Sequence, residues 1–208
     1  MEVNTPIAED IRVTDQNSQY DAACRRLLSD KTILAWIMKS CLAEYRDCDI
    51  KEIAEKYIEG TPQVHEVPVM PDETNAAKIR GVSNVDASRT EGTVIYDIRF
   101  LAVAPSNGEL IQLIVNVEAQ GQFYVGYPLI MRAIYYCSRM ISAQYGTEFV
   151  HEEYQNIKKV YSVFICMDPP KNRRNSITRY RLTEENLVGN VKEPVRHYDL
   201  MTMVMVCL

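Results

Sequence analysis

The chain reads YDIRFLAVAPSNGELIQLIVNVEAQ from Tyr96 to Gln120. Asn107-Gly108, near the middle of this stretch, is the strongest short-range signal for a tight turn between two antiparallel strands. After the turn, polar and apolar residues alternate with period two, so one face of the second strand is wholly apolar and suits a core. The polar face becomes richer toward the end of this strand, which we expect at Gly121. The stretch therefore predicts a β-hairpin with a candidate site on its polar face.

A two-residue loop at Asn107-Gly108 fixes the register of this hairpin. It sets Asp97 directly opposite Glu118, and directly opposed residues share a sheet face with Cβ atoms about 4.5–5.5 Å apart. Two carboxylates at that distance repel each other, so the pair makes sense chiefly with a cation between them. The same register gives two further pairs: Arg99 with Asn116, and Ile95 with Gln120. The register therefore predicts a metal site.

Two alternatives stay open at this point. A wider loop over residues 105–108 sets Asp97 opposite Asn116 and makes Glu118 its diagonal neighbour. Both carboxylates then remain on one face and still reach a shared ion, because the register shifts by two residues. The other alternative is that Asp97 and Glu118 are solvated positions on the open face of an antiparallel sheet. From the spacing alone, a metal site and a solvated face are equally supported.

Residues 94–100, 113–120 and 127–136 together resemble the PD-(D/E)XK nuclease family transposases, which are relatives of the recombination-promoting nucleases of bacteria. Residues 160–166 resemble the strand that follows the second core helix of that family, and the resemblance spans roughly residues 29–182. It implies an α/β fold with a restriction-endonuclease-like core, in which helices flank a mixed sheet. It also implies magnesium-dependent hydrolysis of phosphodiester bonds in DNA.

The resemblance assigns roles to three residues by position. It makes Asp97 the first metal carboxylate and Glu118 the second, with Mg²⁺ as the cofactor and Mn²⁺ able to replace it. Gln120 takes the place usually held by a lysine, and a neutral amide orients an attacking water but cannot help to deprotonate it. The expected activity is therefore weak unless Arg99 or Arg132 supplies the missing charge. An ion pair that only neutralises Asp97 explains Arg99 equally well.

Glu44 is a further candidate metal ligand, because an acidic residue of the first helix sometimes completes the site in this fold class. Glu44 lies off the apolar stripe of its helix, however, so a solvated helix face is the favoured explanation.

Capping signals and apolar periodicity predict the helices. Asp30 caps a first helix that runs to about residue 45. The capping box Asp49-x-x-Glu52 begins a second helix, which stops at Gly60. A third helix covers residues 128–145.

The rest of the chain divides into strands, an irregular stretch and an arm. We expect strands over residues 158–167 and 176–182, and a short one near residues 78–80 within an otherwise irregular stretch. Residues 1–20 are expected to form a flexible arm and residues 21–208 one nuclease-like domain. The apolar run 200–208 must be buried in this domain or in a partner, and because family members typically continue further, the resemblance implies a shortened copy.

Two groups of basic residues are candidate DNA contacts, together with Arg99. Arg132, Tyr136 and Arg139 form one stripe of the third helix, and arginine interleaved with an aromatic ring suits a phosphate backbone and an unstacked base. Tyrosines at helical spacing are nevertheless more often core or interface residues. The densest basic patch is a loop with Lys171, Arg173 and Arg174, followed by Arg179 and Arg181. In an acidic protein this patch favours contact with DNA phosphates, although charge runs are most often solvated loops.

Composition limits the possible functions. The chain has 208 residues, a net charge of −5 and a pI near 5.3, which counts modestly against tight general nucleic-acid binding. Its first 15 residues lack the apolar core of a signal peptide, and no apolar run reaches membrane-spanning length. The six cysteines are scattered without zinc-ligand spacing. We therefore expect a cytoplasmic protein without membrane association.

The sequence and the resemblance together predict a magnesium-dependent DNA endonuclease of transposase type, in which Asp97 and Glu118 hold the ion and Gln120 positions water. The alternative is a catalytically silent copy of the nuclease fold that binds DNA or associates with itself, for instance as a homodimer. Gln120 is the residue that most favours this alternative.

Overall fold

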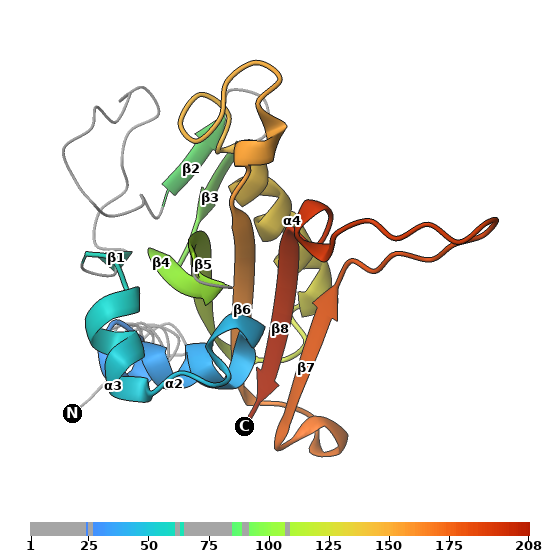
Figure 1. Cartoon of the computed structure of the whole chain (residues 1–208). Coiled ribbons are helices and arrows are strands. Elements are labelled where there is room, and N and C mark those ends of the chain that lie inside the picture. Colours follow the sequence, from blue (N-terminus) through green and yellow to red (C-terminus); the bar gives the residue numbers. More distant parts are fainter. Residues whose placement is uncertain (1–23, 25–26, 61–62, 65–84, 89–91, 107–108) are drawn as a thin grey trace, which may run out of the picture.

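The structure is a computed structural model that describes Cys24 and residues 27–60, 63–64, 85–88, 92–106 and 109–208. Helices flank a mixed sheet (Figure 1), so the predicted α/β class is confirmed. The strand order is β1 (Gln63–Val64), β4 (Ile98–Ser106), β5 (Glu109–Gln122), β6 (Lys159–Asp168), β8 (Met201–Cys207) and β7 (Ser176–Arg181). Strands β5, β6 and β8 are parallel to one another, whereas β1, β4 and β7 run antiparallel to their neighbours. A separate two-stranded ribbon pairs β2 (Val85–Ser88) with β3 (Gly92–Ile95).

Helix α2 (Lys31–Cys41) covers one face of the sheet. It begins as predicted at Asp30, whose side chain accepts hydrogen bonds from the backbone N–H groups of Thr32 and Ile33 and so satisfies two of the unpaired donors of the first turn. The apolar side of α2 packs on the inner faces of β4, β5 and β6, and its buried members are Leu34, Ala35, Met38 and Cys41.

The second predicted helix is shorter and less regular than expected. Asp49 caps α3 (Ile50–Glu52), which continues as a π-helical turn, η2 (Ile53–Tyr57). Glu52 does not complete the capping box, because its carboxylate accepts hydrogen bonds from Lys56 and Tyr57 instead. Short 3₁₀ turns occur at η1 (Ala43–Tyr45), η3 (Tyr154–Asn156), η4 (Lys171–Arg173) and η5 (Val195–His197).

Helix α4 (Leu129–Ser142) covers the opposite face of the sheet (Figure 1). It lies in the crossover between the parallel strands β5 and β6, a connection that generally packs a helix on one face. Leu129, Ala133, Cys137 and Met140 form its buried side, which belongs to a second apolar cluster with Ile114, Phe164 and Met205. The chain turns after the helix at Gly146, which has a φ of +81°.

Helix α4 changes the expected environment of the hairpin. Leu113, Val115 and Val117 of β5 face the α2 side, as the alternation predicts. One sequence alternative made Asp97 and Glu118 solvated positions on an open face, yet Glu118 and its neighbour on that face, Asn116, are buried. Their face is covered because β5 lies inside the sheet, between β4 and β6, with a helix on each side. The alternative of a solvated face is therefore wrong for Glu118, whereas Asp97 is partly exposed.

The register of the hairpin is the predicted one. Arg99 pairs with Asn116 and Ser106 with Glu109, which excludes the wider loop; the two loop residues 107–108 themselves lie outside the described residues. Two details were wrong. Ile95 pairs with Val85 in the separate ribbon rather than with Gln120, because the chain leaves the main sheet between β3 and β4. Strand β5 also continues through Gly121 and ends at Gln122.

The apolar run near the end of the sequence forms β8, which lies between β6 and β7. This strand is buried within the domain, which was the first of the two alternatives that the sequence left open. The strands predicted over 158–167 and 176–182 correspond to β6 and β7. The segment between β7 and β8 projects from the body (Figure 1).

Several predictions concern parts of the chain for which no structure is described. The arm over residues 1–20 and the strand near residues 78–80 lie outside the described residues. Within the described ranges, none of the helices has the length and apolarity needed to cross a membrane.

Candidate functional site

Asp97 and Glu118 meet at the end of the β4–β5 hairpin. Asp97 immediately precedes β4, and Glu118 lies near the end of β5. The backbone N–H of Asp97 donates to Glu118 Oε1 at 3.0 Å, and the backbone N–H of Ala119 donates to Asp97 Oδ2 at 3.1 Å. Each carboxylate is therefore held by backbone from the other strand. The structure thus brings together the two residues that the register predicted as a pair.

Burial and charge repulsion act on Glu118 together. Its side chain lies beneath α4, and the residue is only 3% exposed. Burial, together with the negative charge of Asp97, raises the pKa of Glu118 to about 8, while the Asp97 backbone N–H, Arg132 and Asn116 act in the opposite direction. Near neutral pH the carboxyl group therefore tends to hold a proton unless a cation occupies the site.

The carboxylate oxygens of Asp97 and Glu118 are suitable ligands for Mg²⁺. Mg²⁺ prefers oxygen ligands, keeps several waters and is commonly bound by only one or two protein carboxylates plus substrate phosphate oxygens. A divalent cation would also remove the repulsion that raises the pKa of Glu118. Among the residues that the structure describes, no group of three or more His, Cys, Asp or Glu side chains is arranged to hold a metal. Asp97 and Glu118 would therefore have to share the ion with water and substrate.

Gln120 lies two residues after Glu118 on β5, and the side chains of both point to the same face. Its side-chain amide donates to the backbone carbonyl of Ala119 at 2.9 Å, so it is held back against its own strand. An amide in this position keeps one acceptor oxygen, which can orient a water molecule but carries no charge.

Arg132 places a positive charge near the carboxylate pair. It comes from α4, and its guanidinium carbon lies 5.0 Å from the centroid of the Phe164 ring and 5.8 Å from that of Tyr136. Phe164 is the residue that pairs with Glu118 between β5 and β6. The positive charge of Arg132 lowers the pKa of Glu118. Arg132, one of the two arginines considered from sequence as a source of charge, therefore acts on Glu118.

Tyr136 and Arg99 complete the wall of the site. The Tyr136 ring meets Tyr96 edge-on at 5.2 Å, and burial, followed by the charge of Glu118, raises the pKa of Tyr136 to about 12. The guanidinium of Arg99 is buried over the Tyr96 ring at 5.2 Å. Both side chains therefore pack around the carboxylate pair, and Arg99 offers little surface to a nucleic acid.

Arg139 does not join the site. It is 3% exposed, and its guanidinium donates to the hydroxyl of Tyr135 at 3.1 Å. The predicted stripe of α4 is therefore split: Arg132 and Tyr136 lie beside Glu118, while Arg139 is buried farther along the helix.

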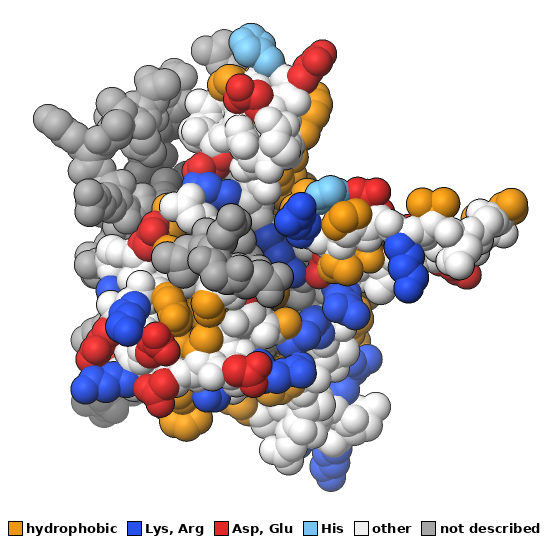
Figure 2. Space-filling model, in the orientation of Figure 1, with side chains coloured by type: hydrophobic (Ala, Val, Ile, Leu, Met, Phe, Trp, Pro, Cys, Tyr) orange, Lys and Arg blue, Asp and Glu red, His pale blue; other side chains and the backbone are white. Residues whose placement is uncertain are grey.

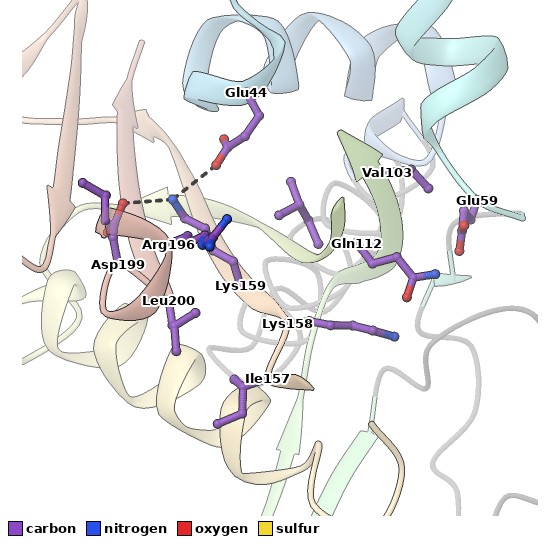
Figure 3. Close-up of a pocket in the computed structure, with 12 residues that line it drawn as sticks. Glu44, Glu59, Val103, Gln112, Ile157, Lys158, Lys159, Arg196, Asp199 and Leu200 are labelled. Atoms are coloured by element: carbon purple, nitrogen blue, oxygen red, sulfur yellow. Dashed lines mark hydrogen bonds and ion pairs between the residues drawn. The ribbon is translucent and has the colours of Figure 1, made fainter. Parts of the chain in front are cut away.

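Glu44 lies on the opposite face of the sheet. It accepts a hydrogen bond from the hydroxyl of Tyr161 at 2.6 Å and pairs with Lys159 at 3.2 Å, and Lys159 also pairs with Asp199 at 3.0 Å. Glu44, Lys159 and Asp199 line a cavity of about 750 Å³ at the end of the sheet where β5 and β6 begin (Figure 3). The structure therefore does not bring Glu44 to Asp97 and Glu118, and the geometry gives no support to it as a third ligand.

The basic loop after β6 lies at the same end of the sheet as the carboxylate pair. Gln122 and Asp168, the last residues of β5 and β6, are register partners, and η4 follows directly. The guanidinium of Arg173 lies 4.9 Å from the centroid of the Phe123 ring. Arg174 is exposed and forms an ion pair with Asp168 at 3.5 Å, which is worth little because both groups are solvated.

Other cations continue beyond this loop. Arg179 is partly buried and donates to the carbonyl of Cys41 at 2.9 Å, so it anchors the end of α2. Arg181 is exposed. On the face drawn in Figure 2, Lys and Arg side chains gather over the β7 edge of the sheet, whereas acidic and basic groups alternate over α2 and α3.

Two residues beside the site were missed as candidates from sequence. Tyr124 and Tyr127 lie in the turn between β5 and α4, and both are exposed. The hydroxyl of Tyr127 accepts a hydrogen bond from Arg132 at 3.4 Å. The absence of acidic residues between Glu118 and Glu148 is a sequence signal that could have directed attention to this turn.

The chain matches no protein-family model, no curated protein and no solved structure.

Proposed function

We propose that this protein is a magnesium-dependent DNA endonuclease of transposase type, built on a restriction-endonuclease-like core. The observation that carries the proposal is the pairing of Asp97 with Glu118 at the end of the hairpin, together with the raised pKa of Glu118. A buried carboxyl group with a perturbed pKa beside a second carboxylate is typical of a functional site, and these oxygens suit Mg²⁺ or Mn²⁺. The resemblance of residues 94–136 to the nuclease family supplies the reaction class.

Each residue of the site has a distinct part in this proposal. Asp97 and Glu118 hold the cation, which supplies Lewis-acid chemistry by activating water and offsetting charge on the phosphate. Gln120 orients the water through its amide oxygen. Arg132 places a fixed positive charge beside the phosphate, where the neutral Gln120 cannot. Arg173 and Arg174 contact the DNA backbone and set its position.

A catalytically silent copy that binds DNA or associates with itself is the second candidate. The hydrogen bond of Gln120 to its own backbone and the deep burial of Glu118 favour it, because both limit the contact of these groups with water. Under either proposal the protein would act in the bacterial cytoplasm.

Nicking of supercoiled plasmid in Mg²⁺ or Mn²⁺, with EDTA as the blank, separates the two candidates. The endonuclease should nick only with the metal, and Asp97→Asn or Glu118→Gln should abolish nicking while the protein stays folded by circular dichroism. Glu44→Gln is the matched control, because Glu44 lies on the other face of the sheet and its variant should nick normally. Residual nicking above a few per cent in both folded dyad variants would place the chemistry elsewhere.

A further inference from the structure

The turn between β5 and α4 presents aromatic rings beside the carboxylate pair. Phe123 is buried, and the Tyr124 ring stands edge-on to it at 5.1 Å while remaining 66% exposed. A backbone bridge between Tyr124 and Pro128 closes the turn, and Gly126 adopts a φ of +90° that favours glycine. Tyr127, at 43% exposure, lies within the same closed turn. The exposed rings are therefore held by an ordered backbone rather than by a long loop.

Cations are interleaved with these rings. Arg173 packs over Phe123, and Arg132 donates to the hydroxyl of Tyr127. Arg132 also acts electrostatically on Glu118, which ties this turn to the proposed site. Two guanidinium groups thus lie against a turn that carries two exposed tyrosines and follows Glu118 along the chain. Tyr124, Tyr127, Arg132 and Arg173 are called the aromatic rim below.

The stretch of chain around the turn is free of negative charge. No Asp or Glu occurs between Glu118 and Glu148, although 28 of the 208 residues are acidic. In a chain of net charge −5, this stretch instead carries only the two cations Arg132 and Arg139. The net charge of this stretch is therefore positive, which suits a polyanion. Arg139 is buried, so Arg132 is the one of these two cations that is placed to contact it.

We propose that this aromatic rim binds unpaired nucleotides, so that the substrate of the site is single-stranded or frayed DNA rather than intact duplex. Proteins that bind single strands combine a positive groove with aromatic rings on which bases stack. The bases of an intact duplex are stacked on one another and do not reach such rings. Tyr124 and Tyr127 would each stack one base while Arg132 and Arg173 contact the flanking phosphates. This inference rests on the proposed function, because it names the form of DNA that the endonuclease accepts.

Binding in the absence of metal tests the inference separately from cleavage. Fluorescence anisotropy in EDTA should show that a labelled 20-nucleotide single strand binds more tightly than the corresponding blunt duplex. Tyr124→Ala and Tyr127→Ala should each weaken single-strand binding by roughly 5- to 150-fold, the range expected for the loss of one base–aromatic stack. Tyr127→Phe keeps the ring and loses only the hydroxyl that meets Arg132, so it should bind nearly as well as wild type. Tyr154→Ala is the matched control. Tyr154 is similarly exposed, but it lies just before β6 begins, at the other end of the sheet from the turn, so its variant should bind as wild type does.

Equal or tighter binding of the duplex would overturn the inference, as would unchanged single-strand binding by both alanine variants. The neighbouring exposed residues Met131 and Ile134 suit contact with a second copy of the chain. If Tyr124→Ala lowers the molar mass measured by light scattering and leaves DNA binding intact, the turn is such an interface and the inference is wrong. Preferential single-strand binding without metal-dependent nicking would instead contradict the proposed endonuclease activity. The proposal that the aromatic rim binds single strands would then still hold.

Discussion

The guanidinium carbon of Arg132 lies 5.0 Å from the centroid of the Phe164 ring, and Phe164 is the residue that pairs with Glu118 between β5 and β6. Helix α4 thus places a fixed positive charge near the buried Glu118, on the face of the sheet that the helix covers. Arg132 of α4 therefore contacts β6 at the residue that pairs with the candidate metal ligand Glu118 of β5.

Replacement of Arg132 should separate metal binding from cleavage. In Arg132→Gln the positive charge that competes with a divalent cation is gone, so Mn²⁺ should bind at least as tightly as in wild type. Cleavage should nevertheless slow by about 100- to 1000-fold, the loss typical when one fixed donor to developing charge is removed. Arg132→Lys should recover part of the rate. Calorimetric Mn²⁺ titration and nicking rates measure the two quantities, and an unchanged nicking rate in Arg132→Gln would remove Arg132 from the mechanism.

The metal-free protein should lose stability as the pH rises from about 4.5 to 8. Burial and Asp97 raise the pKa of Glu118 from its ordinary value of 4.5 to about 8 in the folded state. Between these values the folded state binds more protons than the unfolded state, so the free energy of unfolding falls with increasing pH. The loss amounts to about 1.4 kcal/mol for each unit of pKa shift. Urea unfolding in EDTA at several pH values measures this slope.

Glu118→Gln should remove most of that slope, because the amide keeps an oxygen for the Asp97 N–H but does not titrate. Glu55→Gln is a suitable control, since Glu55 is exposed and its variant should retain the wild-type slope. A wild-type slope that survives in Glu118→Gln would mean that another group is responsible.

Substitutions at Gln120 should have graded effects on cleavage. Gln120→Ala loses the amide oxygen that orients water, so nicking should slow by up to about a hundredfold, as expected when a reacting group is misplaced. Gln120→Lys adds the missing charge and should retain or raise the rate. Single-turnover nicking measures both, and an Ala variant as fast as wild type would show that Gln120 has no catalytic role.

Removal of the two arginines of the basic loop should weaken DNA binding without regard to sequence. Arg173→Ala together with Arg174→Ala should flatten the plot of log K against log salt by nearly one unit for each phosphate that the protein no longer neutralises. Arg173 should account for more of the change, since its guanidinium is held over the Phe123 ring. Anisotropy titrations from about 50 to 200 mM salt provide the slopes. An identical slope in wild type and the double variant would mark the loop as a solvated surface.

The sequence predicted the parts of the site that depend on local chemistry. The Asn107-Gly108 turn and the alternation of β5 were enough to place Asp97 beside Glu118, because turn type and a buried face together fix the register of a hairpin. The cap at Asp30 follows from the same kind of local rule.

The parts that were missed depend on contacts distant in sequence. The burial of Glu118 requires α4, which lies on the polar face as part of the crossover between the paired strands β5 and β6. The position of Glu44 on the other face depends on Tyr161 and Lys159, more than a hundred residues away. The departure of Ile95 from the hairpin is the exception, because it depends on pairing with Val85, only ten residues earlier, in the ribbon. None of these contacts leaves a periodic or capping signal in the chain.

The melting temperature of the wild-type protein with and without Mn²⁺ tests whether Asp97 and Glu118 hold a divalent cation. A cation that binds only the folded state stabilises it by about 1.4 kcal/mol at tenfold excess over Kd, which corresponds to a shift of roughly 3–6 °C for a domain of this size. Wild type should melt higher in millimolar Mn²⁺ than in EDTA. The double variant Asp97→Asn/Glu118→Gln should melt high in EDTA already and ignore the ion. A wild-type melting temperature indifferent to Mn²⁺, or a double variant that still responds to it, would show that this carboxylate pair is not the metal site.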